Sequence, residues 1–237
     1  MEPIFETILY IINIIGIVSF AAAGAMIAIN KETDIFGVVI LSVITCFGGG
    51  ILRDVIIGEK LPAFFSELKM EIIVCVLTAF VVFLLAFIFK EKYVKEEAMV
   101  EKINNVLDAL GLGVFASVGT AAYIEKGAFV AILMGLISSV GGSVIRDVIL
   151  RDIPLILRKR VYAVAVLLGS SVYYLVASVI MKDLQSADIV ATLSCMAVIF
   201  VIRMCATVFR WNMPKAIDFS KIKMADSSEN SNEKIVK

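Results

Sequence analysis

The chain has 237 residues, 60% of them hydrophobic, and its mean hydropathy is +0.97. That apolar share is too high for an ordinary soluble domain, whose surface needs polar residues. The 22 Lys and Arg residues balance 22 Asp and Glu residues, so we expect no nucleic-acid partner. There is no His, and the four Cys lie in apolar segments without the close pairing of a metal site. We therefore expect neither a bound metal nor a cofactor.

Seven apolar runs follow one another along the chain, and about 20 mostly apolar residues suffice to cross a bilayer. They are residues 7–30, 35–52, 72–89, 103–124, 127–145, 161–181 and 189–209. Five runs carry no charge, whereas the fourth contains Asp108 and the seventh Arg203. We expect Arg203 to extend towards the nearer headgroups. The sequence predicts an all-α membrane protein with seven transmembrane helices.

One motif occurs twice, as GGGILRDVI at 48–56 and GGSVIRDVI at 141–149. The match extends upstream, where Phe36 pairs with Phe129, and downstream, where Pro62 pairs with Pro154. Each copy holds three expected spans, so the second must enter the membrane from the opposite face. Inverted repeats of this kind are typical of transport proteins, although a purely structural relic is an alternative.

The repeat divides the chain into five parts. Residues 1–89 form the first three-helix repeat, 90–102 a cytoplasmic linker, 103–181 the second, inverted repeat, 188–210 the seventh helix and 211–237 a disordered cytoplasmic tail. The connections after the first, third, fifth and seventh spans carry most of the loop Lys and Arg residues. The positive-inside rule then places the N-terminus outside and the C-terminus in the cytoplasm of a cell membrane.

Glycine clusters interrupt the second and fifth spans at a similar depth in the bilayer. Glycine weakens a helix, and a break at this depth would present free carbonyls to a cation across a wet passage. The alternative is that the glycines only allow close helix packing. The residues expected at these kinks are Gly48, Gly49, Gly50, Gly141, Gly142 and Ser143.

Polar and charged residues near the kinks are candidates for lining or gating a pore. Neighbouring residues point about 100° apart on a helix, so we expect each Arg of the repeated Arg-Asp motif to find a carboxylate elsewhere. A structural ion pair at headgroup level is the alternative, and Asp108 has a second explanation at the start of a helix. An Arg at each pore mouth would oppose cations unless an Asp neutralises it or the Arg acts in gating. The candidates are Thr45, Ser42, Ser138, Ser139, Arg53, Asp54, Arg146, Asp147, Asn13 and Asp108.

The seven spans, the inverted repeat and the doubled Gly-Gly-x-x-x-Arg-Asp element resemble the prokaryotic members of the TRIC family of trimeric intracellular cation channels. The same bacterial group is also labelled a glycine transporter family. The resemblance covers about residues 4 to 209. It implies a homotrimer in which each subunit has its own pore, with the second and fifth helices kinked at glycines. It also implies passive movement of monovalent cations, chiefly potassium, so the permeant ions would be potassium or sodium.

Three functions remain open at this stage. The first is a potassium-permeable channel, the second a small amino-acid carrier for glycine, and the third a scaffold without transport. No nucleotide-binding loop, metalloprotease motif or nucleophile elbow occurs in the sequence, so we do not expect an enzyme.

Overall fold

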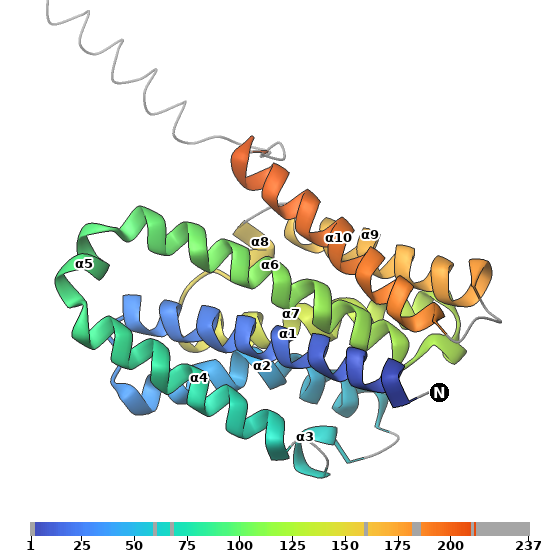
Figure 1. The fold of residues 1–237 in the computed structure, drawn as a ribbon, viewed down its shortest axis with the longest axis horizontal. Coiled ribbons are helices and arrows are strands. Elements are labelled where there is room, and N and C mark those ends of the chain that lie inside the picture. Colours follow the sequence, from blue (N-terminus) through green and yellow to red (C-terminus); the bar gives the residue numbers. More distant parts are fainter. Residues whose placement is uncertain are drawn as a thin grey trace, which may run out of the picture.

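The computed structural model describes residues 3–58, 61–66, 69–158, 161–181, 186–209 and 211, and these are mostly helical. Seven of the described helices are long and apolar enough to cross a membrane, which confirms the predicted fold class (Figure 1). They are α1 (Pro3–Asn30), α2 (Ile35–Ile57), α4 (Lys69–Ile88), α6 (Glu97–Ala121), α7 (Ala128–Ile149), α9 (Tyr162–Leu175) with the π-helical turn η2 (Val176–Ile180), and α10 (Ala187–Val208). The shorter elements are α3 (Ala63–Ser66), α5 (Lys90–Lys95), the 3-10 turn η1 (Ile124–Lys126) and α8 (Leu155–Arg158).

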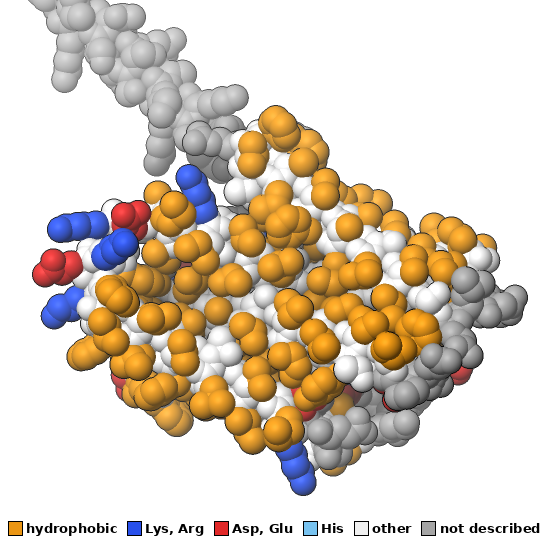
Figure 2. Space-filling model, in the orientation of Figure 1, with side chains coloured by type: hydrophobic (Ala, Val, Ile, Leu, Met, Phe, Trp, Pro, Cys, Tyr) orange, Lys and Arg blue, Asp and Glu red, His pale blue; other side chains and the backbone are white. Residues whose placement is uncertain are grey.

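The expected linker at 90–102 is itself helical, because it consists of α5 and the first turns of α6. Of the expected tail at 211–237, only Trp211 lies within the described residues. On the face in Figure 2, apolar side chains cover the middle of the bundle, while many of the charged side chains gather at one end, around α5. A broad apolar surface is unfavourable in water, so this belt suits the hydrocarbon of a bilayer.

Short polar signals set the ends of the central helix α2. The side chain of Asp34 accepts a hydrogen bond from the backbone N–H of Gly37 at 2.8 Å, which satisfies one of the free donors of the first turn. At the other end, Gly58 takes a left-handed conformation with φ of 69°, and its N–H donates to the carbonyl of Asp54. The motif Arg53-Asp54 therefore lies in the last turns of α2, inside the helix.

The two repeats pack around a pseudo-twofold axis. In the first repeat α1 contacts α2 and α4, and in the second α6 contacts α7 and α9 in the same way. Equivalent helices meet at the centre, where α1 lies against α6 and α2 against α7. The equivalent rings of Phe20 and Phe115 stack there with centroids 5.1 Å apart and planes at 4°. Helix α10 stands outside both repeats and packs mainly on α6 and α9.

The expected backbone breaks at the glycine clusters are absent. Helices α2 and α7 run without interruption through Gly48–Gly50 and Gly141–Gly142, so the prediction of helix ends with free carbonyls was wrong. The glycines instead bring the two helices into backbone contact. A Cβ on Gly48 would lie 3.1 Å from the Cα of Gly142, and one on Gly141 would lie 2.9 Å from the Cα of Gly49.

The closest approach obeys the same symmetry. A Cβ on Gly49 would overlap the carbonyl oxygen of Ser138, and a Cβ on Gly142 would overlap that of Thr45. Small residues allow such contacts in membranes, where dispersion between helices replaces the hydrophobic effect. Close packing, the alternative explanation, therefore accounts for these four glycines. A bend within the continuous helices stays a prediction.

Gly49→Ala and Gly50→Ala should have opposite outcomes, although the two residues are neighbours. A methyl group at Gly49 forces α2 and α7 apart, and overpacking of this kind costs about 1–3 kcal/mol. Nothing lies within 4 Å of a Cβ on Gly50, so Gly50→Ala should leave stability unchanged or slightly raised. Thermal unfolding of the detergent-solubilised protein measures both, and equal melting temperatures for the two variants would contradict the packing role.

Candidate functional site: two Arg-Asp pairs and a vestibule

In the first repeat, Arg53 forms an ion pair with its own neighbour. The Nε and Nη2 atoms of Arg53 both lie 2.7 Å from Oδ1 of Asp54. The other oxygen, Oδ2, accepts a hydrogen bond from the backbone N–H of Ala63 at 3.1 Å. The carboxylate thus neutralises the guanidinium and fixes the start of the short helix α3.

The second repeat reproduces this arrangement. Nε and Nη2 of Arg146 lie 2.9 and 2.7 Å from Oδ1 of Asp147, and the N–H of Leu155 donates to Oδ2 at 2.9 Å. The expectation that each Arg would pair with a distant carboxylate was therefore wrong. The arginine side chain is long enough to curl back across the 100° between neighbouring residues. The downstream prolines match because each precedes the N–H that the Asp side chain binds.

The two pairs differ in their access to solvent. The side chains of Arg53 and Asp54 are 11% and 13% exposed, whereas that of Arg146 is 0% exposed. Helices α2 and α7 are the second and fifth of the predicted spans, so they cross the membrane in opposite directions. Their C-terminal ends, and with them the two pairs, therefore belong to opposite halves of the bilayer.

Arg53 and Asp54 line a cavity of about 230 Å³, which we call the vestibule. Its other polar walls include Asn13 and Ser138, and Gly50 adds open backbone. Nη1 of Arg53 reaches Oγ of Ser138 at 3.4 Å, and its Cζ lies 5.7 Å from the ring centroid of Tyr123. Apolar side chains close the remaining sides: Ile17, Cys46, Phe47, Ile51, Ala63, Phe64, Phe115 and Val118. The vestibule is thus a small, mixed chamber beside a neutralised cation.

The equivalent position in the other half holds a buried charge cluster. Oδ2 of Asp108 lies 3.1 Å from Nη2 of Arg203, and its Oδ1 accepts from the Tyr162 hydroxyl at 3.0 Å. The guanidinium of Arg203 also stacks over the Tyr162 ring at 4.5 Å. Each of these three residues is at most 3% exposed. The prediction that Arg203 extends to the headgroups was wrong, because Asp108 and Tyr162 hold it inside the protein.

The Asp108–Arg203 pair and the Arg146–Asp147 pair are both buried. Two buried donors, Nη1 of Arg146 and Nε of Arg203, have no hydrogen-bond partner among the described atoms. Buried polar atoms of this kind usually bind ordered water. Asp108 therefore belongs to a buried network, twelve residues into α6 rather than at its start.

Several hydroxyls expected to face a pore instead bond their own helices. Ser42, Thr45 and Ser139 donate to carbonyls one turn back, at 2.8, 2.6 and 2.9 Å. Ser143 donates likewise to Val140 at 2.8 Å. Of the hydroxyl candidates near the kinks, Ser138 is the one that the vestibule exposes.

Sequence reasoning missed Tyr162 and Tyr123, and it gave Arg203 a different role. A tyrosine at the start of an apolar span is commonly a headgroup anchor, so nothing local distinguished Tyr162. The signal available was the lone charge in each of two spans, Asp108 and Arg203, which together suggest a buried pair.

Fold and site together define a multi-pass α-helical membrane protein built on an inverted repeat, with a polar vestibule in one half and a buried charge cluster in the other. The sequence model of the family described as "Glycine transporter" matches residues 10–87 and 105–178, once in each repeat. The UPF0126 inner membrane protein YadS of Escherichia coli K12 is 33% identical over 87% of this chain and 94% of its own length. The chain therefore belongs to this family.

Solved structures agree with the assignment. A prokaryotic TRIC channel crystallised in 0.5 M KCl aligns with a TM-score of 0.73 and 31% identity over 88% of this chain and all of its own. The TRIC trimeric intracellular cation channel orthologue from Rhodobacter sphaeroides aligns with a TM-score of 0.72 and 27% identity over 86% of this chain and all of its own. The protein is thus a member of the prokaryotic TRIC family, and the resemblance noted in the sequence is confirmed.

Breaking the Asp108–Arg203 pair from either side should destabilise the protein strongly. Asp108→Asn or Arg203→Gln leaves a buried partner charge uncompensated, which costs about 3–5 kcal/mol. The double variant Asp108→Asn/Arg203→Gln should lose much less than the sum of the two, because neither charge is then left without its partner. Chemical or thermal unfolding in detergent gives the three values.

The exposed pair Lys31–Asp152, with Nζ and Oδ2 2.7 Å apart, is the control for this cycle. Its side chains are 41% and 37% exposed, so Lys31→Ala should cost at most about 1 kcal/mol. Additive losses at Asp108 and Arg203 would show that the two residues are not energetically coupled.

Proposed function

We propose that this protein is a passive channel for monovalent cations, chiefly potassium, with a pore in each subunit beside α2 and α7. The observation that carries the proposal is the 31% identity and TM-score of 0.73 to a prokaryotic TRIC channel over 88% of the chain. The proposal is for conduction rather than catalysis, and it requires no cofactor.

The charges of the site support a cation path. Each repeat places one arginine in the proposed route, and the adjacent aspartate, 2.7 Å away, compensates it. A fixed arginine at each mouth therefore does not present an uncompensated positive charge to a passing cation. The side-chain oxygens of Ser138 and Asn13 remain beside the vestibule, and neutral oxygens of this kind suit K⁺ or Na⁺.

The proposed route begins in the vestibule at Gly50 and Ser138 and continues past the crossing of α2 and α7. It ends at the buried charges of Arg146, Asp147, Asp108 and Arg203. These side chains are buried, so we assign the described conformation to a closed channel. Opening requires these ion pairs to separate or rotate, since a hydrated cation does not pass side chains that are 0–5% exposed.

We propose further that the protein is a homotrimer in the cell or inner membrane. The Rhodobacter sphaeroides orthologue is described as trimeric, and the Escherichia coli relative as an inner membrane protein. The excess of Lys and Arg in the connections after α1, α4 and α7 supports a cytoplasmic C-terminus and an outer N-terminus. In that orientation the vestibule opens to the outside.

Planar bilayer recordings test conduction directly. The purified protein should give discrete currents that reverse near the potassium equilibrium potential in a KCl gradient. Gly50→Leu should lower the unitary current severalfold, because Gly50 lines the vestibule and nothing lies within 4 Å of a Cβ at this position. Val55→Leu, on the exposed surface of α2, is the matched control and should leave the current unchanged. Silent bilayers would reject the channel.

A carrier for glycine is the second candidate, favoured by the family description and by the guanidinium of Arg53 in the vestibule. A cavity of about 230 Å³ has room for a small amino acid, and an arginine is a suitable partner for its carboxylate. Proteoliposomes should then show saturable uptake of radiolabelled glycine that Arg53→Gln abolishes. Under the channel proposal no saturable uptake occurs. A protein with neither currents nor uptake would act as a scaffold.

A further inference from the structure

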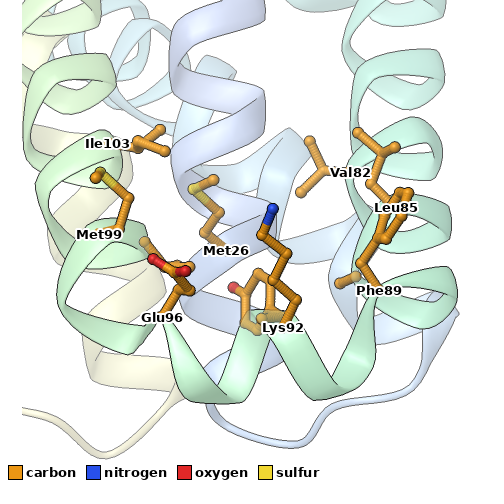
Figure 3. Close-up of a pocket in the computed structure, with 11 residues that line it drawn as sticks. Met26, Val82, Leu85, Phe89, Lys92, Glu96, Met99 and Ile103 are labelled. Atoms are coloured by element: carbon orange, nitrogen blue, oxygen red, sulfur yellow. The ribbon is translucent and has the colours of Figure 1, made fainter.

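A second cavity lies away from the proposed route, at the end of the bundle that carries α5. It has a volume of about 380 Å³ and is bounded by α1, α4, α5 and the first turns of α6 (Figure 3). Its lining is mostly apolar, from Met26 on α1, Val82 and Leu85 on α4, and Met99 and Ile103 on α6. We call it the α5 pocket.

The α4 wall of the pocket begins at the end of a candidate membrane span and extends back into that span. Helix α4 ends at Ile88, and the wall extends back along it from Phe89 to Val82. Seven residues at 1.5 Å each give a depth of about 10 Å. Several wall residues, including Leu85, Phe89, Met99 and Ile103, are largely exposed in the subunit. A depth and chemistry of this kind match the upper part of a lipid acyl chain.

Two opposite charges stand at the mouth of the pocket. Lys92 and Glu96 are one turn apart at the end of α5, and Figure 3 shows both side chains directed towards the apolar walls. Neither side chain has an ion-pair or hydrogen-bond partner among the residues that the structure describes. The Lys92 ammonium and the Glu96 carboxylate thus both lie at the mouth of the apolar pocket without forming an ion pair with each other.

The base of the mouth is fixed by a hydrogen bond. The hydroxyl of Tyr93 donates to Oδ1 of Asn30 at 3.1 Å, which ties α5 to the end of α1. Burial raises the pKa of the Tyr93 phenol, so it remains a neutral donor at physiological pH. Helix α5, which carries Lys92, is therefore anchored to α1, and this anchor sets the distance between Lys92 and the apolar walls.

We propose that the α5 pocket binds a membrane phospholipid whose zwitterionic headgroup carries a primary ammonium, as in phosphatidylethanolamine. The lipid phosphate accepts from the ammonium of Lys92, the lipid ammonium donates to the carboxylate of Glu96, and an acyl chain lies along Val82 and Ile103. A choline headgroup has no N–H to donate, and an anionic headgroup without an ammonium leaves Glu96 repelled. The proposal does not depend on what the protein transports.

Quenching of tryptophan fluorescence by brominated lipids tests lipid binding at the pocket itself. The chain has one tryptophan, Trp211, so Phe89→Trp in a Trp211→Phe background places a single reporter in the pocket wall. Vesicles of phosphatidylcholine would contain either brominated phosphatidylethanolamine or brominated phosphatidylcholine. We expect the ethanolamine lipid to associate with this reporter about fivefold more strongly, the effect of one added charge contact near a membrane surface.

Matched variants separate the pocket from the general lipid surface. Phe87→Trp, also at the end of α4 but outside the pocket lining, should show no preference between the two lipids. Lys92→Gln and Glu96→Gln should each remove the preference at Phe89→Trp, whereas Lys95→Gln, outside the lining, should retain it.

Three results would overturn the proposal. Equal quenching by the two lipids at Phe89→Trp would remove the role of the headgroup. Stronger quenching by brominated phosphatidylglycerol than by the ethanolamine lipid would indicate an anionic site. Protection of the reporter from every lipid would show that a neighbouring subunit fills the pocket.

Discussion

Backbone contact between α2 and α7 is the constraint on which the rest of this structure depends. The helices meet at Gly48, Gly49, Gly141 and Gly142, where a single methyl group would reach 3.1 Å or less from the opposing main chain. Side chains of ordinary size would hold the helix axes several ångströms further apart. The contact fixes the pseudo-twofold relation between the repeats. It also places each Arg-Asp pair at a set distance from the crossing.

The two repeats are alike where α2 and α7 cross, but they differ at the helix ends that carry the Arg-Asp pairs. Both repeats use the same device, an arginine neutralised by the next aspartate, which in turn holds the loop that follows the helix. In one half the pair borders an open vestibule. In the other, the extra helix α10 contributes Arg203, which pairs with Asp108 and covers the equivalent space. The seventh helix, which has no counterpart in the repeat, is thus the element that distinguishes the two halves.

Buried charge in a membrane protein is costly unless it is paired. Four of the six residues that form the three buried or half-buried pairs belong to the repeated motif, so two symmetric pairs came with the duplication. The third pair has one partner, Asp108, at the position where the first repeat has Asn13. The neutral amide borders the vestibule, and the acid is matched by an arginine from outside the repeats. The repeat that α10 covers therefore has the acid Asp108 at this position, and the repeat without such a helix has the neutral Asn13.

The sequence by itself determined the membrane class, the seven spans and the inverted repeat, because hydrophobic length and a repeated motif can be read directly from the order of residues. It also located the polar residues of both halves, including Arg53, Ser138 and Asp108. Only the tertiary structure decided what these residues contact. Glycine has two uses in a membrane helix, breaking it or letting another helix approach, and the neighbour that selects packing lies about 93 positions away. The partners of Arg203 and Tyr162 come from three different helices, and such convergence depends on how the helices pack, which no local spacing encodes.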